Sequence, residues 1–361
     1  TGTLVYAAGE GTDDRGLVVK SADSGATWTS VFTGTGQQSG VFRALAIHPV
    51  LTTTVYAAGV ELDATTYEGR GVVYRSLDGG LTWARVLTAT SGCCWVDLYA
   101  LALNPVTPTT VYAGGYETDV SSAYAVVYRS YDSGDHWTQA LTATDGPSQQ
   151  FTALLVHPIT PTMVFAGSQN PKFVYRSIDD GLSWTKVLTD NGFRLVTDPP
   201  STLYAADDWR EVYGSVANGE AGTWAKVGGD TPGDIRSLAI DLAPTPGALY
   251  LGFRVEGVFK STDGGLSWLS HNQYIESPLE PRDISVDPQD RSRLFVSAGC
   301  GGGWTSADAG QTWTQAPIAE CVGVFALHPA DASVVYAGVA SDARGAILRS
   351  GDSGATFAPV Y

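Results

Sequence analysis

Short apolar segments recur along the whole chain, and each has the length and composition of a β-strand. Residues 43–47 (Arg-Ala-Leu-Ala-Ile) and 55–59 (Val-Tyr-Ala-Ala-Gly) combine β-branched, aromatic and small side chains. Residues 72–75 and 83–87 continue in the same way. No stretch places apolar side chains at helical spacing. The pattern therefore predicts an all-β protein built from four strand types, which we name A, B, C and D in chain order.

The four strand types recur in a unit of about 40–50 residues, which is typical of repeat proteins built from small sheets. Eight B strands lie near Val5, Val55, Val111, Val164, Leu203, Leu249, Leu294 and Val335, and seven A strands lie near Leu45, Leu101, Leu154, Leu195, Leu238, Ile284 and Phe325. We therefore expect eight four-stranded units, of which the first lacks its inner A strand. The first unit then has only three strands. Alternatively, the missing strand lies upstream of this sequence, or another chain supplies it, since an open edge is a site for strand addition.

A motif with the pattern Ser-x-Asp-x-Gly-x-x-Trp joins strand C to strand D in nearly every unit. Ser and Asp side chains can bond to nearby backbone N–H groups and hold a tight turn, and Gly adopts backbone angles that other residues resist. The motif residues are Ser21, Asp23, Gly25, Trp28; Ser76, Asp78, Gly80, Trp83; Ser130, Asp132, Gly134, Trp137; Ser177, Asp179, Gly181, Trp184; Ser261, Asp263, Gly265, Trp268; Ser306, Asp308, Gly310, Trp313; and Ser350, Asp352, Gly354, Phe357. A disrupted copy runs from Ser215 through Gly219 to Trp224.

The motif resembles the Asp-box, or BNR, repeat of sialidases, sortilin-type receptors, xyloglucanases and a photosystem II assembly factor. The resemblance covers essentially the whole chain at the level of the repeat. It implies a single β-propeller domain over residues 1–361, with the motif at the turn between the third and fourth strands of each blade. In that family the motif is structural and lies away from the active face, so we expect the same of its residues here.

Composition narrows the range of partners. The formal net charge is −16, which argues against nucleic acids and anionic membranes as partners. No apolar run is long enough to span a bilayer. Few lysines, many Thr and Gly residues and four cysteines favour an exported protein that is extracellular, at the cell surface or periplasmic.

The cysteines fall into two pairs. Cys300 follows a B strand and Cys321 precedes the next A strand, so both lie on the face of a propeller that carries the B–C and D–A connections. A disulfide between them is predicted. Cys93 and Cys94 lie across the ring, which leaves either a bond between these two neighbours or two reduced thiols.

Three histidines, His48, His157 and His328, precede proline at the end of an A strand, where other units carry Asn or Asp. That equivalence predicts a role in a turn rather than in a metal site. No metal-ligand spacing, phosphate loop or nucleophile motif is present, and we expect no cofactor.

The predicted function is that of a non-catalytic binding or assembly module, because the repeated residues are structural and no catalytic set converges. A sialidase arginine triad is not recognisable, and a xyloglucanase of this family needs two propellers. Candidate contacts for a protein or glycan on the loop-rich face are Trp95, Asp208, Trp209 and Arg210. The alternative is a glycoside hydrolase or lyase that uses loop carboxylates at a central channel, with Asp207, Asp208 and Glu211 as candidates.

Overall fold

The computed structural model describes residues 4–11, 13–35, 39–63, 65–90, 95–144, 149–169, 172–189, 194–198, 201–207, 210–229, 231–241, 247–273, 281–341 and 344–361. Throughout these ranges the chain forms β-strands and turns, as its apolar pattern predicts. The described residues include no helix with the length and apolarity needed to cross a membrane.

Consecutive strands pair in antiparallel order and form small units. The first three units are β1 (Val5–Glu10), β2 (Gly16–Ser21), β3 (Thr29–Thr33); β4 (Gly40–Ile47), β5 (Val55–Leu62), β6 (Gly69–Ser76), β7 (Ala84–Ala89); and β8 (Trp95–Leu103), β9 (Val111–Thr118), β10 (Ala123–Ser130), β11 (Thr138–Ala143). The next two are β12 (Gln150–Val156), β13 (Val164–Gln169), β14 (Phe173–Ser177), β15 (Thr185–Thr189); and β16 (Arg194–Asp198), β17 (Thr202–Ala206), β18 (Val212–Ser215), β19 (Ala225–Lys226).

The last three units are β20 (Ile235–Asp241), β21 (Ala248–Phe253), β22 (Gly257–Ser261), β23 (Leu269–Ser270); β24 (Asp283–Val286), β25 (Leu294–Ser297), β26 (Gly303–Ser306), β27 (Thr314–Gln315); and β28 (Cys321–Leu327), β29 (Val335–Ser341), β30 (Arg344–Ser350), β31 (Ala358–Pro359). One parallel pairing, between Gly69 and Trp95, joins the second and third units into one eight-stranded sheet. The other units are separate sheets.

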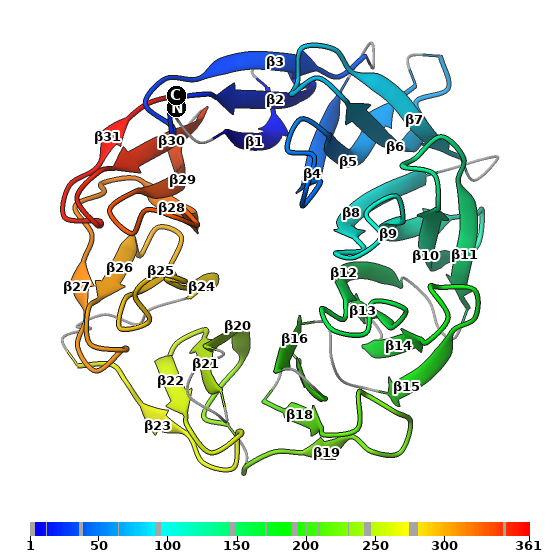
Figure 1. Ribbon diagram of the computed structural model, residues 1–361. Coiled ribbons are helices and arrows are strands. Elements are labelled where there is room, and N and C mark those ends of the chain that lie inside the picture. The colour runs from blue at the N-terminus through cyan, green and yellow to red at the C-terminus, as the bar shows by residue number, and fades with distance from the viewer. Residues whose placement is uncertain are drawn as a thin grey trace.

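The units stand side by side around a central opening (Figure 1). The strands that begin the four-stranded units, such as β4 and β20, line the opening, and the last strands lie at the outer edge. The first and last units are neighbours, and the two ends of the chain lie together there (Figure 1). Apolar side chains of adjacent units pack between the sheets, so the core is a series of layers around the ring.

The first unit differs from the others at its inner edge. Its strand β1 pairs only with β2, whereas the equivalent strand β5 pairs with β4 and β6. Every residue of β1 is at least partly exposed, but β5 is buried at all positions except its last. The described part of this unit therefore has three strands.

The repeated turns are held by side chains of the motif itself. In the second unit Ser76 Oγ donates to Asp78 Oδ1 at 2.8 Å, and the Gly80 N–H donates to Ser76 Oγ at 2.7 Å. The Thr82 N–H donates to Asp78 Oδ1 at 2.9 Å, and the Trp83 indole N–H donates to the Gly80 carbonyl at 3.2 Å. The same Gly-to-Ser bond recurs in the turns of Asp23, Asp132, Asp179, Asp263, Asp308 and Asp352. In these turns the motif serine therefore binds the motif glycine N–H and holds the turn closed.

A second kind of turn follows the inner strands. His48 Nδ1 accepts hydrogen bonds from the N–H groups of Val50 and Leu51, at 3.2 and 2.9 Å. His157 accepts two such bonds in the same way, Asn104 does so through its side-chain oxygen, and His328 Nδ1 accepts one, from the Ala330 N–H. The predicted turn role of the three histidines is confirmed by these contacts.

Side chains of one unit also hold the motif turn of the next. Tyr56 OH and Arg75 Nη1 donate to the Ser133 carbonyl, at 2.8 and 2.7 Å. At the seam between the last and first units, Tyr336 OH and Arg349 Nε donate to the Ser24 carbonyl at 2.6 and 2.7 Å. The seam therefore uses the same contact as an internal junction.

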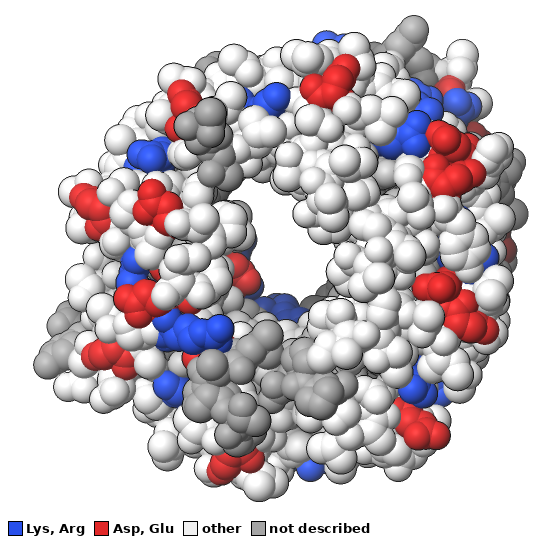
Figure 2. Space-filling model, in the orientation of Figure 1, with Lys and Arg blue, Asp and Glu red and all other residues white. Residues whose placement is uncertain are grey.

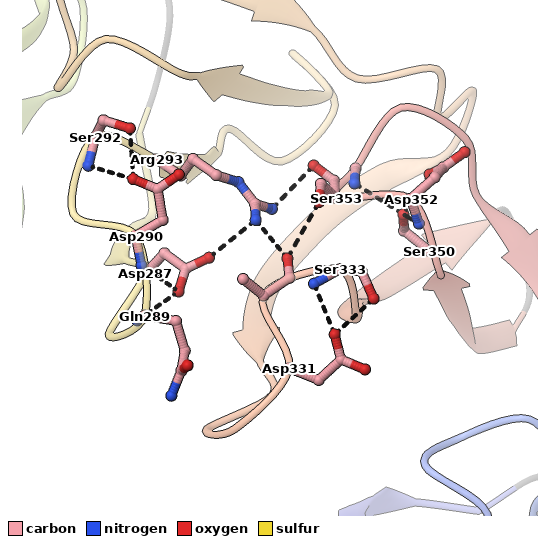
Figure 3. A network of polar contacts seen from close by, with 12 residues as sticks. Asp287, Gln289, Asp290, Ser292, Arg293, Asp331, Ser333, Ser350, Asp352 and Ser353 are labelled. Carbon is pink, nitrogen blue, oxygen red and sulfur yellow. Dashed lines mark hydrogen bonds and ion pairs between the residues drawn. The ribbon is translucent and has the colours of Figure 1, made fainter.

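The junction between the seventh and eighth units uses a different arginine for this purpose. Thr305 and Phe295 occupy the places that Arg75 and Tyr56 have in the second unit. The phenylalanine side chain has no hydrogen-bond donor, and the threonine side chain is too short to replace an arginine. Arg293 instead donates to the Ser353 carbonyl at 3.1 Å, and its guanidinium pairs with Asp287 at 3.2 Å (Figure 3). A guanidinium group thus still donates to the neighbouring motif turn, but it comes from Arg293 before β25 and not from the third strand of the unit.

Candidate functional site

The connections from B to C strands and from D strands to the next A strand lie on one face of the ring, opposite the motif turns. Cys300 and Cys321 form a disulfide on this face, which confirms the predicted pairing. Beside it, Gly299 and Val322 exchange two backbone hydrogen bonds of 2.8 Å. The seventh and eighth units are therefore tied together covalently at the loop-rich face. Cys93 and Cys94 lie outside the described residues.

Trp95 begins β8 and is half-buried on the same face. Its ring lies against the Gly69 backbone so closely that a Cβ at Gly69 would be 2.4 Å from it. The ring borders a cavity of about 180 Å³ that is lined by Glu10, Ser39, Gly40, Val41, Arg43, Val60, Leu62 and Trp95. Trp95 is thus both a packing residue and part of a surface hollow.

The loop that follows β17 contains the other predicted contacts. Asp207 is buried, accepts the N–H groups of Arg210 and Glu211 at 3.1 and 3.0 Å, and lies 3.5 Å from Lys172 Nζ. Glu211 accepts a bond from Tyr213 and lies 3.2 Å from a lysine ammonium. Arg210 is exposed, while Asp208 and Trp209 lie outside the described residues. Asp207 therefore organises its loop rather than facing a substrate.

A larger cavity of about 340 Å³ lies where the inner strands of the fifth, sixth and seventh units begin. It is lined by Arg194, Arg236, Arg254, Pro281 and Arg282. Figure 2 shows basic side chains at the edge of the central opening near the positions of β16 and β20 in Figure 1, whereas the wall across from them is largely uncharged. None of these arginines is a candidate from the sequence.

The local fold explains why these side chains meet. Arg194 is the first residue of β16, and Arg282 directly precedes β24. Arg236 is the extra residue of a β-bulge, because Ile235 and Ser237 pair with adjacent residues of β21. A bulge re-aims one side chain. Arg254 follows β21 and is fixed by its N–H bond to the Asp234 carbonyl at 2.8 Å.

The same bulge occurs in the second unit, but there the arginine at the bulge is paired with a carboxylate. There Arg43 is the extra residue, and its Nε lies 2.9 Å from Asp97 Oδ2 while its guanidinium covers the Tyr99 ring at 4.8 Å. Burial raises the pKa of Asp97, and the Arg43 charge opposes that rise. Arg236 and Arg282 have no hydrogen bond or ion pair through their guanidinium groups within the part of the chain that the structure describes.

One carboxyl group adjoins the arginine cavity. Asp283 follows Arg282, and burial raises its pKa, although the Arg194 charge acts in the opposite direction. Its side chain accepts a bond from Ser285 at 3.3 Å. Arg194 donates to the Ile235 carbonyl at 3.4 Å. Backbone contacts and one neighbouring acid thus orient this side of the cavity.

No protein-family model matches the chain, and no curated protein matches it in sequence. Solved structures with the same fold include Saccharomyces cerevisiae Sqt1, with a TM-score of 0.63, 13% identity and coverage of 98% of this chain and 92% of that one. YCF48 bound to D1 peptide has a TM-score of 0.52 and 15% identity over 73% of this chain and 81% of that one. The Niastella koreensis GH74 enzyme has a TM-score of 0.49 and 17% identity over 99% of this chain, which spans 60% of the length of that enzyme. The likenesses to Sqt1 and YCF48 show a β-propeller fold and nothing finer.

Proposed function

We propose that residues 1–361 form one eight-bladed Asp-box propeller that acts outside the cytoplasm as a non-catalytic binding or assembly module. The strand units and the Ser-Asp-Gly turns support the blade count and the repeat type. The disulfide supports an oxidising compartment. The first blade, with its partly exposed β1, is the proposed place for a donated strand.

The observation that carries this proposal is that the two faces of the ring differ in structure. The motif residues are occupied by turn bonds on one face, whereas two cavities lie at the other, among connections of differing sequence. Loops on a rigid scaffold are where binding residues concentrate. Trp95 and Arg210 are proposed ligand contacts, together with Asp208 and Trp209 in the same loop as Arg210.

The comparisons support a binding role because they include propellers with bound partners. YCF48 was solved with the D1 peptide, and Chaetomium thermophilum Sqt1 was solved with the N-terminus of the ribosomal protein L10. A catalytic role has less support, since Asp207 and Glu211 are engaged in structural contacts. A peptide or protein is accordingly our first choice of partner, and a glycan is the second.

Peptide and glycan arrays probed with the purified protein test this function. We expect a specific ligand whose binding is lost in Trp95→Ala or Arg210→Ala and kept in Leu266→Ala, because Leu266 is an exposed residue of a motif turn on the opposite face. A parallel panel of polysaccharides is expected to show no turnover. Turnover that disappears in Glu211→Gln, or binding that depends on Leu266 and not on the loop face, would contradict the proposal.

A further inference from the structure

The arginine cavity concentrates positive charge in a strongly acidic protein. The chain has a net charge of −16, yet four arginines line one hollow of about 340 Å³. They come from three neighbouring units, so the cluster is a product of the fold and not of one basic segment. Guanidinium groups repel one another at short range, and an anion between them removes that repulsion.

Two of these side chains are poised for such an anion. Arg236 is turned out of its strand by the bulge, and Arg282 occupies the corresponding place before β24. At the matching bulge of the second unit, Asp97 already neutralises Arg43 at 2.9 Å. In the described residues no carboxylate does this for Arg236 or Arg282. An outside carboxylate would bind these two guanidinium groups as Asp97 binds Arg43.

The side chains that line the cavity indicate the chemical class of its ligand. Each guanidinium is a planar fork of donors that matches a carboxylate with two parallel bonds. The two forks of Arg236 and Arg282 in one hollow suit two carboxylates carried close together. The lining side chains are arginines and one proline, so its described part offers no aromatic face on which a sugar ring would stack.

We infer that this cavity binds an acidic peptide segment through at least two neighbouring carboxylates. The inference rests on the proposed function, because it names the partner class of the loop-rich face. Arginine clusters are a recurrent means of recognising acidic motifs. Arg236 and Arg282 bind the carboxylates directly, and Arg194 and Arg254 complete the positive wall of the cavity.

The test measures binding of a fluorescein-labelled hexaglutamate peptide by fluorescence anisotropy. Arg236→Gln and Arg282→Gln are each expected to weaken binding roughly ten- to hundredfold, as the loss of a charge-assisted hydrogen-bond partner does. Arg15→Gln is the matched control, since it removes the same charge from an exposed B–C connection in the first unit. Raising the NaCl concentration from about 50 to about 500 mM is expected to weaken wild-type binding because salt screens these charges. Unchanged thermal unfolding of the variants shows that they fold.

Three outcomes would overturn the inference: no hexaglutamate binding at low salt, an equal loss in Arg15→Gln, or preferential binding of a hexagalacturonate that carries the same number of carboxylates. The last result would assign the cavity to acidic glycans. Failure here is separable from failure of the proposed function. If hexaglutamate does not bind but an array ligand still depends on Trp95, the loop face is a binding surface and only the acidic-peptide assignment is wrong.

Discussion

Closure of the ring can be tested at Gly25, which lies in the motif turn of the first unit. Its φ is +78°, and a Cβ at this position would lie 2.1 Å from Cε1 of Tyr336 in the last unit. Gly80, the equivalent residue of the second unit, has a φ of +91°, but its Cβ would meet nothing closer than Val31, at 3.4 Å. The pair Gly25→Ala and Gly80→Ala therefore separates backbone strain from disruption of the seam.

The expected magnitudes follow from these contacts. Both variants place alanine in the left-handed region, which costs about 1–2 kcal/mol. Only Gly25→Ala also displaces the Tyr336 ring, and overpacking of this kind costs about 1–3 kcal/mol. That movement breaks the Tyr336 bond to the Ser24 carbonyl, which is worth about 0.5–1.5 kcal/mol. We expect Gly25→Ala to be about 2–4 kcal/mol less stable than Gly80→Ala.

The assay combines urea unfolding with native-state hydrogen exchange, because a ring of units need not unfold in one step. In Gly25→Ala, amides of β1–β3 and β28–β31 are expected to exchange faster than in the wild type, while those of β12–β15 are unchanged. Equal stability of the two variants, or faster exchange spread evenly around the ring, would refute the conclusion that the Ser24 contact closes the seam.

Three further predictions concern charge and the disulfide. Hydrogen bonds from Thr82 lower the pKa of Asp78 to about 2. The ionised Asp78 therefore stabilises the fold above the ordinary aspartate pKa, and this stabilisation is lost as the pH falls through the lowered pKa. The melting temperature should drop between about pH 4 and pH 2, and it should drop less in Asp78→Asn. Asp132 raises the pKa of His136. This ion pair stabilises the folded state below the histidine pKa of the unfolded chain, and the stabilisation is lost as the pH rises through the raised pKa. An NMR titration should show the His136 pKa return toward about 6.5 in Asp132→Asn. Removal of the disulfide by Cys321→Ser should lower the free energy of unfolding by roughly 3 kcal/mol in the chain-entropy account, and a calorimetric change below about 1 kcal/mol would contradict it.

The fold was readable from the sequence because its determinants are local and repeated. Ser76, Asp78 and Gly80 form hydrogen bonds with one another within five residues, so each copy of the motif predicts a turn without help from distant residues. The pairing of Cys300 with Cys321 followed once the strands were placed. A recurring basic residue directly before the motif serine, such as Arg75 or Arg349, was a signal for the bond to the next unit that the sequence reading did not use.

The arginine cavity was missed for the opposite reason. Arg194, Arg236 and Arg282 are far apart in sequence, and each alone resembles an ordinary polar residue at the start of a strand. Their convergence depends on the ring, and the orientation of Arg236 depends on a bulge that strand periodicity does not reveal. Asp207 shows the converse: an acid in a variable loop suggested chemistry, but it is buried and caps its own loop.

The shared junction contact bears on how such a protein can change its size. The Ser24 carbonyl receives the same pair of donors at the seam as the Ser133 carbonyl receives inside the ring, so the last unit meets the first as the second meets the third. Duplication of a repeat that carries this contact would therefore create no new kind of boundary.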